Sequence, residues 1–227
     1  MNMGSALTKT ESGLTCNTQY IRYIWAYSSC GVSSATILTQ STTSCSFQCG
    51  QIYTDSRDGQ SYQTIQIGTQ CWMSQNINYQ TGTSWCYDNS PTNCTIYGRL
   101  YDWYTASSVC PPGWHLPSNI EWCTLTTYID ATVDCNFVGW TGTDVGYKMK
   151  STSGWNSAGN GSNASGFNGL PGGHCCFSTL GDLGYFWSSW QESSADAWIY
   201  ALKFDYNTVN KSSYSKGSGF SVRCLKD

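Results

Sequence analysis

Charged residues are scarce in this chain, and the scarcity limits what the protein can bind. Asp, Glu, Lys and Arg make up 11% of its 227 residues, whereas soluble domains average about 25%. The formal net charge is −3. Proteins that bind nucleic acids neutralise phosphates with clustered Lys and Arg, so we expect no nucleic-acid partner.

Long apolar runs are also absent. The sequence has no stretch of about 18 apolar residues, so it predicts no membrane-spanning helix. The opening residues, MNMGSALTKTESG, hold no apolar core of the kind that export signals carry. We expect any export signal of the native gene to be missing from this chain, and the opening residues could equally be an expression scar.

Common catalytic signatures are missing as well. The chain has no GxSxG, HExxH, P-loop or GxGxxG motif. Its two histidines are His115, in PGWHLP, and His174, which precedes Cys175. A cysteine beside a histidine suggests a nucleophile with its base, but neighbours in sequence are rarely catalytic partners in space. We therefore predict that the protein is not an enzyme and that His115 fixes its turn by packing or hydrogen bonding.

Aromatic and small polar residues, by contrast, are abundant. The sequence contains 11 Trp, 16 Tyr and 23 Gly, and its surface must be built largely from Ser, Thr, Asn, Gln and Tyr. Such side chains contact neutral polar partners without long-range charge. This composition is typical of extracellular adhesive or carbohydrate-facing proteins, and it predicts a protein or glycan ligand on another surface.

Thirteen cysteines indicate disulfide bonds formed in an oxidising compartment. Zinc sites usually carry paired CxxC segments, which this chain lacks. The odd count leaves at least one thiol free or bonded to another chain. Two pairings are suggested by proximity in the sequence: Cys86 with Cys94 across a short polar loop, and Cys123 with Cys135 near a predicted helix. The sequence leaves open the pairing of Cys16, Cys30, Cys45, Cys49, Cys71, Cys175 and Cys176.

The composition changes near residue 46. Residues 1–46 are rich in Ser and Thr with one apolar patch, YIRYIWAY, and we interpret them as a Cys-containing extension. Residues 47–227 are long enough for one domain with its own core. In that domain, a turn at Asp58-Gly59 and alternating apolar residues up to Trp72 predict a pair of strands.

Two helices are predicted next. The segment YGRLYDWYTASS, residues 97–108, carries aromatic and apolar residues at helical spacing. Ser118 and Glu121 form an S-x-x-E capping box that predicts the start of the second helix. We expect its apolar stripe to consist of Leu125, Tyr128 and Ile129.

The remainder of the chain predicts a loop and a sheet. Residues 151–173 are dense in Gly, Ser and Asn and predict a long irregular loop, which is usually functional or pinned by other contacts. Residues 184–227 predict three or four strands joined by polar turns. The expected fold class is therefore α+β.

Six segments occur in the order of a known family. They are DGQSYQTIQIGTQCWMSQNINY, WCYDNSPTNCTIYGRLYDWYTA, VCPPGWHLPSNIEW, SGFNGLPGG, GYFWSS and GFSVRC. Together they cover roughly residues 47–227 and resemble the Fibrobacter succinogenes major paralogous domain. That family is considered to have a C-type-lectin-like fold, so the resemblance implies two helices, long irregular loops and a small antiparallel sheet whose last strand returns beside the first.

The resemblance also bears on disulfides and cofactors. Lectin-like domains tie a helix region to the last strand by a long-range disulfide, which implies a Cys110–Cys224 bond here. Closing a loop of about a hundred residues contributes about 4–5 kcal/mol in the chain-entropy model. Sugar-binding C-type lectins hold calcium with Glu-Pro-Asn or Gln-Pro-Asp and Trp-Asn-Asp, and these tripeptides are missing. We expect no cofactor, with a structural calcium ion elsewhere left open.

Some domains of this group serve as variable proteins of diversity-generating retroelements. In those systems, adenine-rich codons near the C-terminus are rewritten while an intervening framework stays fixed. Residues 190–207 resemble such a stretch. Within it, AWIYALKFDYNTV places large apolar residues at every second position. This period of two predicts a half-buried strand with an outward face between the aromatic positions.

The sequence therefore predicts a binding face on the C-terminal sheet. An exposed Trp contributes contact area at low entropic cost, and polar neighbours orient the ligand. The alternative is that this Trp is buried and the rest is an ordinary solvated face. The expected contact residues are Trp190, Gln191, Glu192, Ile199, Ala201, Lys203, Asp205 and Asn207.

A structural role is the second hypothesis. The chain would then be a subunit of a surface filament or pilus-like assembly, in which the extension and an unpaired cysteine join neighbouring copies. Low charge, abundant hydroxyl groups and an odd number of cysteines suit such self-association. Either role, ligand binding or assembly, implies a disulfide-stabilised protein that is secreted or displayed on the cell surface.

Overall fold

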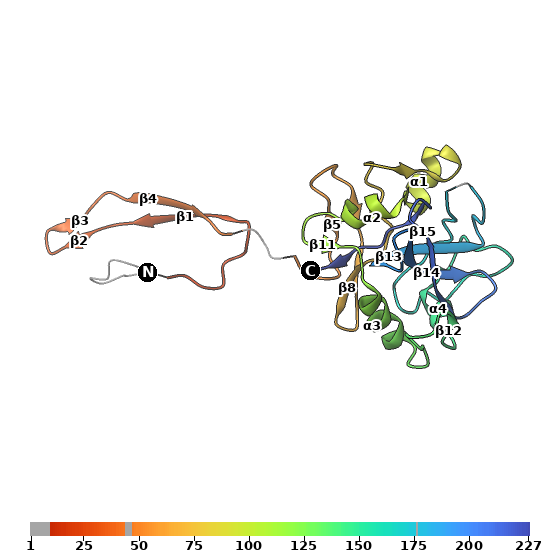
Figure 1. The fold of residues 1–227 in the computed structure, drawn as a ribbon. Helices are drawn as coiled ribbons and strands as arrows, with labels where there is room; N and C mark the ends of the chain where they lie inside the picture. Colours follow the sequence, from red (N-terminus) through yellow and green to blue (C-terminus); the bar gives the residue numbers. More distant parts are fainter. Residues whose placement is uncertain (1–9, 44–46, 176) are drawn as a thin grey trace. The chain divides into compact units, whose positions relative to one another are not determined.

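The computed structural model describes residues 10–43, 47–175 and 177–227 (Figure 1). The chain divides into two compact units, with the boundary between Gln48 and Cys49. The described part of the second unit mixes α-helices with small β-sheets, which confirms the predicted α+β class. Within the described ranges, no helix is long and apolar enough to cross a membrane.

The first unit is a β-hairpin. Its long strands, β1 (Gln19–Ile24) and β4 (Thr36–Ser41), pair antiparallel over six residues each. Two short strands, β2 (Tyr27–Ser28) and β3 (Gly31–Val32), pair near the tip. The apolar patch YIRYIWAY therefore lies on β1 and the residues after it, where most of its side chains are exposed.

Two larger sheets build the second unit. Among the described residues, the first has seven strands, in the spatial order β12 (Gly139–Thr141), β15 (Val209–Ser215), β14 (Asp196–Lys203), β13 (Leu183–Gln191), β16 (Phe220–Ser221), β10 (Leu100–Tyr101) and β9 (Ser84–Trp85). The second, counted over the same residues, has four, in the order β11 (Trp114–His115), β17 (Leu225–Lys226), β8 (Gln70–Met73) and β7 (Thr64–Ile67). A further pair consists of β5 (Tyr53–Thr54) and β6 (Ser61–Tyr62). The final strand, β17, thus pairs with a strand from the start of this unit.

The predicted opening strands are confirmed. Asp58 lies in the turn between β5 and β6, and Gly59 follows it with a φ of +77°, which a glycine adopts without strain. Strands β7 and β8 then pair antiparallel, with Ile65 opposite Trp72. At the other end of the chain, five strands occur from residue 183 onwards in the described part, so the prediction of three or four missed the shortest ones.

The first predicted helix is wrong in its extent. The segment 97–108 contains the end of α1 (Pro91–Tyr97), strand β10 and most of α2 (Trp103–Val109). Gly98, with a φ of +77°, ends α1, and the Asp102 carboxylate accepts a hydrogen bond from the Thr105 amide at 2.8 Å to begin α2. Short apolar runs fit helical and strand periods alike, which explains the error.

The second predicted helix is confirmed as α3 (Asn119–Ile129). Ser118 and Glu121 form the capping box in both directions. Leu125 is buried, but Tyr128 is exposed, so the predicted apolar stripe is wrong at that position. Trp122 takes the core position instead, because it lies one turn before Leu125 on the same face. The described residues also include α4 (Val145–Met149) and a 3-10 helix, η1 (Tyr87–Asn89), so the expectation of two helices is too low.

The core of the second unit is aromatic. Trp72, Trp122 and Phe167 contact one another, with ring centroids 5.1–5.9 Å apart. Residues 151–173 form no helix or strand, as predicted. They nevertheless place Trp155 and Phe167 in the core, so the long loop is pinned by buried side chains.

Arg223 ties that loop to the rest of the core. Its guanidinium is fully buried and donates to the carbonyls of Met73 (3.2 Å), Phe167 and Asn168 (3.3 Å). It also donates to the Asn76 side-chain oxygen at 2.8 Å. Burial lowers the pKa of Arg223 to about 9. One cation therefore joins the β8 region and the long loop through carbonyl and amide oxygens.

Disulfides connect distant parts of the described chain. The predicted bonds Cys86–Cys94, Cys123–Cys135 and Cys110–Cys224 are all confirmed. A fourth bond, Cys49–Cys71, settles one pairing that the sequence leaves open. The other cysteines of uncertain pairing divide as follows: Cys16 is disulfide-bonded, Cys30 is an exposed thiol, Cys175 is buried, and Cys45 and Cys176 lie outside the described residues.

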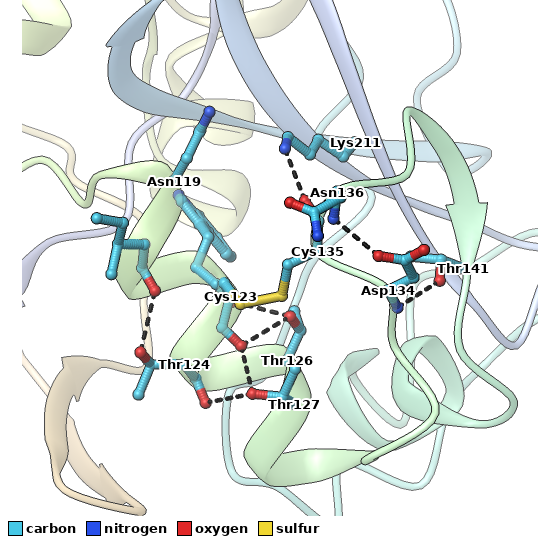
Figure 2. The surroundings of a disulfide bond; sticks show 12 residues. Asn119, Cys123, Thr124, Thr126, Thr127, Asp134, Cys135, Asn136, Thr141 and Lys211 are labelled. Carbon is cyan, nitrogen blue, oxygen red and sulfur yellow. Dashed lines mark hydrogen bonds between the residues drawn. A yellow bond between two sulfur atoms is a disulfide. The ribbon is translucent and has the colours of Figure 1, made fainter.

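Figure 2 shows how the Cys123–Cys135 bond joins α3 to the segment before β12. Lys211 of β15 donates to the Cys135 carbonyl at 2.8 Å. The Asp134 amide donates to the Thr141 hydroxyl at 2.8 Å. The outer edge of the seven-stranded sheet is thereby fixed to a helix.

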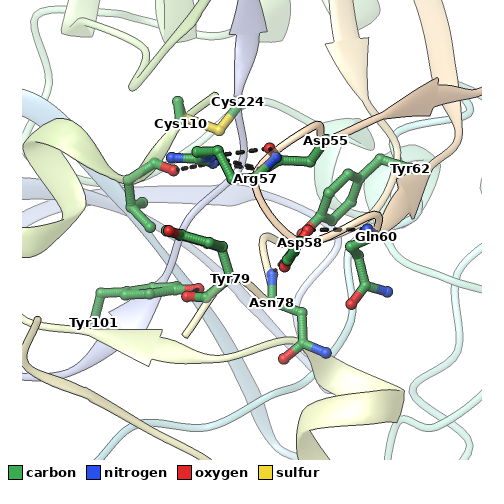
Figure 3. Close-up of polar contacts among 11 residues, drawn as sticks. Asp55, Arg57, Asp58, Gln60, Tyr62, Asn78, Tyr79, Tyr101, Cys110 and Cys224 are labelled. Carbon is green, nitrogen blue, oxygen red and sulfur yellow. Dashed lines mark hydrogen bonds and ion pairs between the residues drawn. A yellow bond between two sulfur atoms is a disulfide. The ribbon is translucent and has the colours of Figure 1, made fainter. Parts of the chain in front are cut away.

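An ion pair fixes the β5–β6 turn to the end of α2 (Figure 3). The buried Asp55 carboxylate lies 2.6 Å from Arg57, whose guanidinium also donates to the Val109 carbonyl at 2.8 Å. Val109 ends α2 and precedes Cys110. The turn is therefore bound to the residue next to Cys110, whose disulfide with Cys224 joins α2 to the C-terminal segment.

His115 links the C-terminal residue to α3. Its ring nitrogens lie 2.7 Å from Asp227 and 2.9 Å from Glu121. Partial burial lowers the pKa of His115, but the hydrogen bonds with the two carboxylates outweigh it and hold this pKa above its ordinary 6.5. The pKa of Glu121 lies below its ordinary 4.5, because hydrogen bonds from Ser118 and His115 outweigh the desolvation that raises it. The structure thus agrees with the prediction that His115 fixes its turn by hydrogen bonding.

We expect Arg223→Met to lower the free energy of unfolding by about 3 kcal/mol or more, because several buried oxygens lose their donor. Urea unfolding followed by tryptophan fluorescence measures this. Arg22→Met is the control, since Arg22 forms an exposed ion pair with Glu11, and exposed ion pairs contribute little to stability. Equal effects of the two substitutions would contradict the role given to Arg223.

The His115 contacts predict a pH-dependent stability. The raised pKa of His115 means that its contribution is complete below pH 6.5 and is lost as pH rises through the raised value. The Glu121 contribution is present above pH 4.5 and is lost as pH falls. The difference in unfolding free energy between the wild type and His115→Gln should therefore be largest between these values. A difference that stays constant into the alkaline range would show that protonated His115 contributes nothing.

Candidate functional site

Alternate residues of β14 face the main core. Tyr200 and Leu202 are buried there, and Phe186 of β13 lies directly opposite Tyr200. The Trp122 ring stacks on Tyr200 with centroids 4.8 Å apart. The buried face that the sequence alternation predicts is confirmed at these positions.

The opposite face of β14 is also buried. Ile199 and Ala201 are 0% and 2% exposed, and they lie opposite Trp187 and Tyr185 of β13. Both of these aromatic rings contact Phe220 of β16, with centroids 4.8 Å apart. The prediction that Ile199 and Ala201 form part of an outward binding face is therefore wrong, because a second aromatic cluster covers that face.

The other six predicted contact residues lie in two groups at opposite ends of β14. Strand pairing places Gln191 opposite Ala197 at one end and Leu183 opposite Lys203 at the other. Six residues of strand separate these ends by about 20 Å. We name residues 190–195 the Trp190 turn and residues 203–208 the Tyr206 turn. The first holds Trp190, Gln191 and Glu192, and the second holds Lys203, Asp205 and Asn207.

A buried lysine holds the Trp190 turn. The Lys216 ammonium donates to the Gln191 side-chain oxygen at 2.9 Å and to the carbonyls of Ser193 and Ser194 at 2.9 and 3.1 Å. It also lies 4.7 Å from the ring centroid of Trp103. An ammonium has three N–H groups, and here all three find an oxygen in the turn.

The Trp190 turn presents aromatic surface. Trp190 is 46% exposed, and its amide donates to the Ser188 hydroxyl at 3.3 Å. The Trp103 indole donates to the Ser188 carbonyl at 2.9 Å. Tyr104, which is exposed, contacts Trp103 edge to face, with centroids 5.8 Å apart. Glu192 of the turn is exposed as well.

A second buried lysine holds the Tyr206 turn. The Lys150 ammonium donates to the carbonyls of Lys203, Phe204 and Tyr206 at 3.0–3.1 Å. Burial lowers the pKa of Lys150, and the nearby charge of Asp205 opposes this shift. Both turns that carry predicted contact residues are thus organised by an internal cation.

The exposed groups of the Tyr206 turn differ in character from those of the first turn. Tyr206 stacks on Trp140 of β12, with centroids 4.4 Å apart. The Lys203 ammonium lies 3.1 Å from the Asp205 carboxylate. Asn207 is exposed at its side chain, while its carbonyl accepts from the Gly146 amide at 2.7 Å. This surface offers an aromatic pair, a paired charge and an amide.

Comparison with known proteins identifies the domain type. The family model of the Fibrobacter succinogenes major domain matches residues 65–226. The chain belongs to this family. The match confirms the resemblance carried by the six sequence segments. No curated protein and no solved structure matches the chain.

Sequence reasoning missed the two lysines of this family member. Lys150 and Lys216 lie among polar residues, and nothing local marks them as buried. Their oxygen partners are 22–56 residues away in the chain. The one available signal was their rarity, since the chain has only 11 Lys and Arg residues in total.

The His174 ring and the Cys175 sulfur each make a hydrogen bond to a different neighbour. The His174 ring lies 2.7 Å from the Ser178 hydroxyl and accepts or donates there according to its tautomer. The Cys175 sulfur is buried and accepts from the Gly219 amide at 2.9 Å. In the part of the chain that the structure describes, no cluster of three His, Cys, Asp or Glu side chains could hold a metal ion.

Substitution of each lysine in turn tests whether it orders only the turn that it contacts. We expect Lys216→Met to increase hydrogen exchange at the amides of residues 192–196 and to leave residues 203–208 protected, because only the first turn loses its cation. Lys150→Met should have the reverse effect. Hydrogen exchange with mass spectrometry resolves the two segments. If either substitution loosened both turns equally, the lysines would be general stabilisers of the fold.

Proposed function

We propose that this protein is a secreted or surface-displayed ligand-binding module. The observation that carries the proposal is the pair of turns at the ends of β14, each fixed by a buried lysine and each exposing aromatic and polar side chains. Rigid presentation lowers the entropic cost of binding, because the contact residues are ordered before the ligand arrives. Four disulfides between described cysteines suit a protein that works outside the reducing cytosol.

The Trp190 turn is the proposed main contact surface. Trp190 and Tyr104 offer exposed rings, and large rigid aromatics are frequent anchors at binding sites. Glu192 and the hydroxyls of the turn supply hydrogen-bonding groups beside them. Such a surface fits a neutral polar ligand, either a glycan or a polar protein segment, because aromatic faces pack against apolar patches and hydroxyl groups orient polar ones.

We further propose that the scaffold is C-type-lectin-like and that its turns are the positions open to diversification. Because Ile199 and Ala201 are packed between aromatic rings, most replacements there would disturb the core. Variation would therefore be confined to residues 190–192 of the first turn and residues 203–207 of the second. A reverse transcriptase beside the gene, with a near-copy of its 3′ end differing mainly at adenines, would support this. Codon differences spread evenly over the buried positions would contradict it.

Trp190→Ala tests the proposed function. We expect this variant to lose binding by about tenfold or more, as removal of an aromatic anchor commonly does. The full chain would be screened on a glycan array and an array of cell-surface proteins, and affinities would be measured for the hits. Tyr128→Ala is the matched control, because Tyr128 is an exposed aromatic residue on α3 that belongs to neither turn and whose ring lies beside Gly68.

Unchanged binding by Trp190→Ala, in a variant with wild-type urea unfolding, would exclude the Trp190 turn. Asp205→Asn then tests the Tyr206 turn in the same assay. If neither substitution changes any hit, the proposal that these turns bind ligand fails.

A further inference from the structure

The N-terminal hairpin has one uncharged face that no other described residue of the first unit covers. Direct strand partners share a face, so Ile21 and Thr39 lie beside Tyr23 and Ile37. The Trp25 ring stacks on Tyr23, with centroids 6.2 Å apart. Ile21, Tyr23, Trp25 and Ile37 are 50%, 54%, 54% and 61% exposed. We call this surface, with Gln19, Thr39 and Ser41, the Ile37 face.

The other face of the hairpin is contacted by the chain itself. Arg22 forms an ion pair with Glu11 at 2.7 Å, and the Thr15 amide donates to the Tyr20 hydroxyl at 2.8 Å. A cavity of about 360 Å³ is lined mainly from that side, by residues that include Leu14 and Leu38, and Tyr23 and Ser41 of the Ile37 face also line it. The segment before β1 therefore occupies this side, and the Ile37 face remains the unpartnered one.

Strand β4 of the hairpin also lacks the usual protection against pairing with another strand. Within the described residues its sheet has two strands, so β1 and β4 each have an outer edge. Strand β4, TILTQS, contains no charged residue and no proline, which are the features that normally block edge association. An isolated two-stranded hairpin is only marginally stable in water. Burial of the Ile37 face would stabilise it.

We propose that the Ile37 face binds the same face of a second copy of this chain. An uncharged apolar face is complementary to itself, and a two-fold axis places one patch against its copy. The seven side chains of the face offer on the order of 500 Å² per copy, so a pair would bury about 1,000 Å², the area at which specific interfaces begin. The association is independent of ligand binding by the second unit.

Analytical ultracentrifugation of the full chain tests the proposal. We expect the mass to rise toward that of a dimer by about 100 µM, since an interface of this size is weak. Ile37→Glu should keep the chain monomeric over the same range, because it places a charge in the middle of the buried face. Leu38→Glu is the matched control. It changes the neighbouring aliphatic residue on the other face and should leave dimerisation unchanged.

Further arms separate this proposal from its competitors. The dimer should persist in reductant and in Cys30→Ser, because the face and not a disulfide joins the copies. It should also persist in Trp190→Ala, which affects only the proposed ligand surface. Ile21→Thr keeps strand propensity and should weaken the dimer at least threefold without unfolding the hairpin. A monomeric wild type, a dimer that depends on Cys30, or equal loss in Ile37→Glu and Leu38→Glu would each overturn the proposal.

Discussion

Three buried cations hold the second unit together, and none of them relies on a carboxylate as its hydrogen-bonding partner. Arg223, Lys150 and Lys216 each donate to carbonyl or amide oxygens. A buried charge is costly unless several polar groups surround it. Each cation therefore selects a conformation in which several backbone oxygens converge, and it orders segments that have no helix or strand of their own.

This arrangement explains how a chain with few charged residues can order long irregular loops. Residues 151–173 gain no stability from regular secondary structure, yet Arg223 and the aromatic core fix them at both ends. The turns flanking β14 are ordered in the same way by Lys216 and Lys150. Disulfides add connections between elements, and Cys110–Cys224 joins the end of α2 to the segment before the last strand. The surface is then free to carry hydroxyl, amide and aromatic groups.

The two units differ in how far they bury their apolar side chains. The second unit buries many of its aromatic side chains in two clusters, one on each face of strands β13 and β14. The hairpin of the first unit leaves comparable side chains half exposed on a two-stranded sheet. Ligand recognition by the turns and self-association by the hairpin are therefore separate proposals that rest on separate surfaces.

The sequence by itself determined the features that depend on residues close together in the chain. The Ser118–Glu121 capping box, the Asp58-Gly59 turn, and the Cys86–Cys94 and Cys123–Cys135 bonds all follow from local spacing. Family resemblance added the Cys110–Cys224 bond. The split of residues 97–108 between helix and strand was not predictable, because strand β10 forms only through its partners β9 and β16.

Tertiary structure alone decided which side chains reach the surface of β14. Period-two alternation shows that two faces exist, but burial of the second face depends on Phe220 and Trp187, which come from other strands. The distance between Trp190 and Asp205, about the length of strand β14, is likewise evident only in the folded structure. The same holds for the lysines, since an ammonium becomes a structural centre only when oxygens from distant residues converge on it.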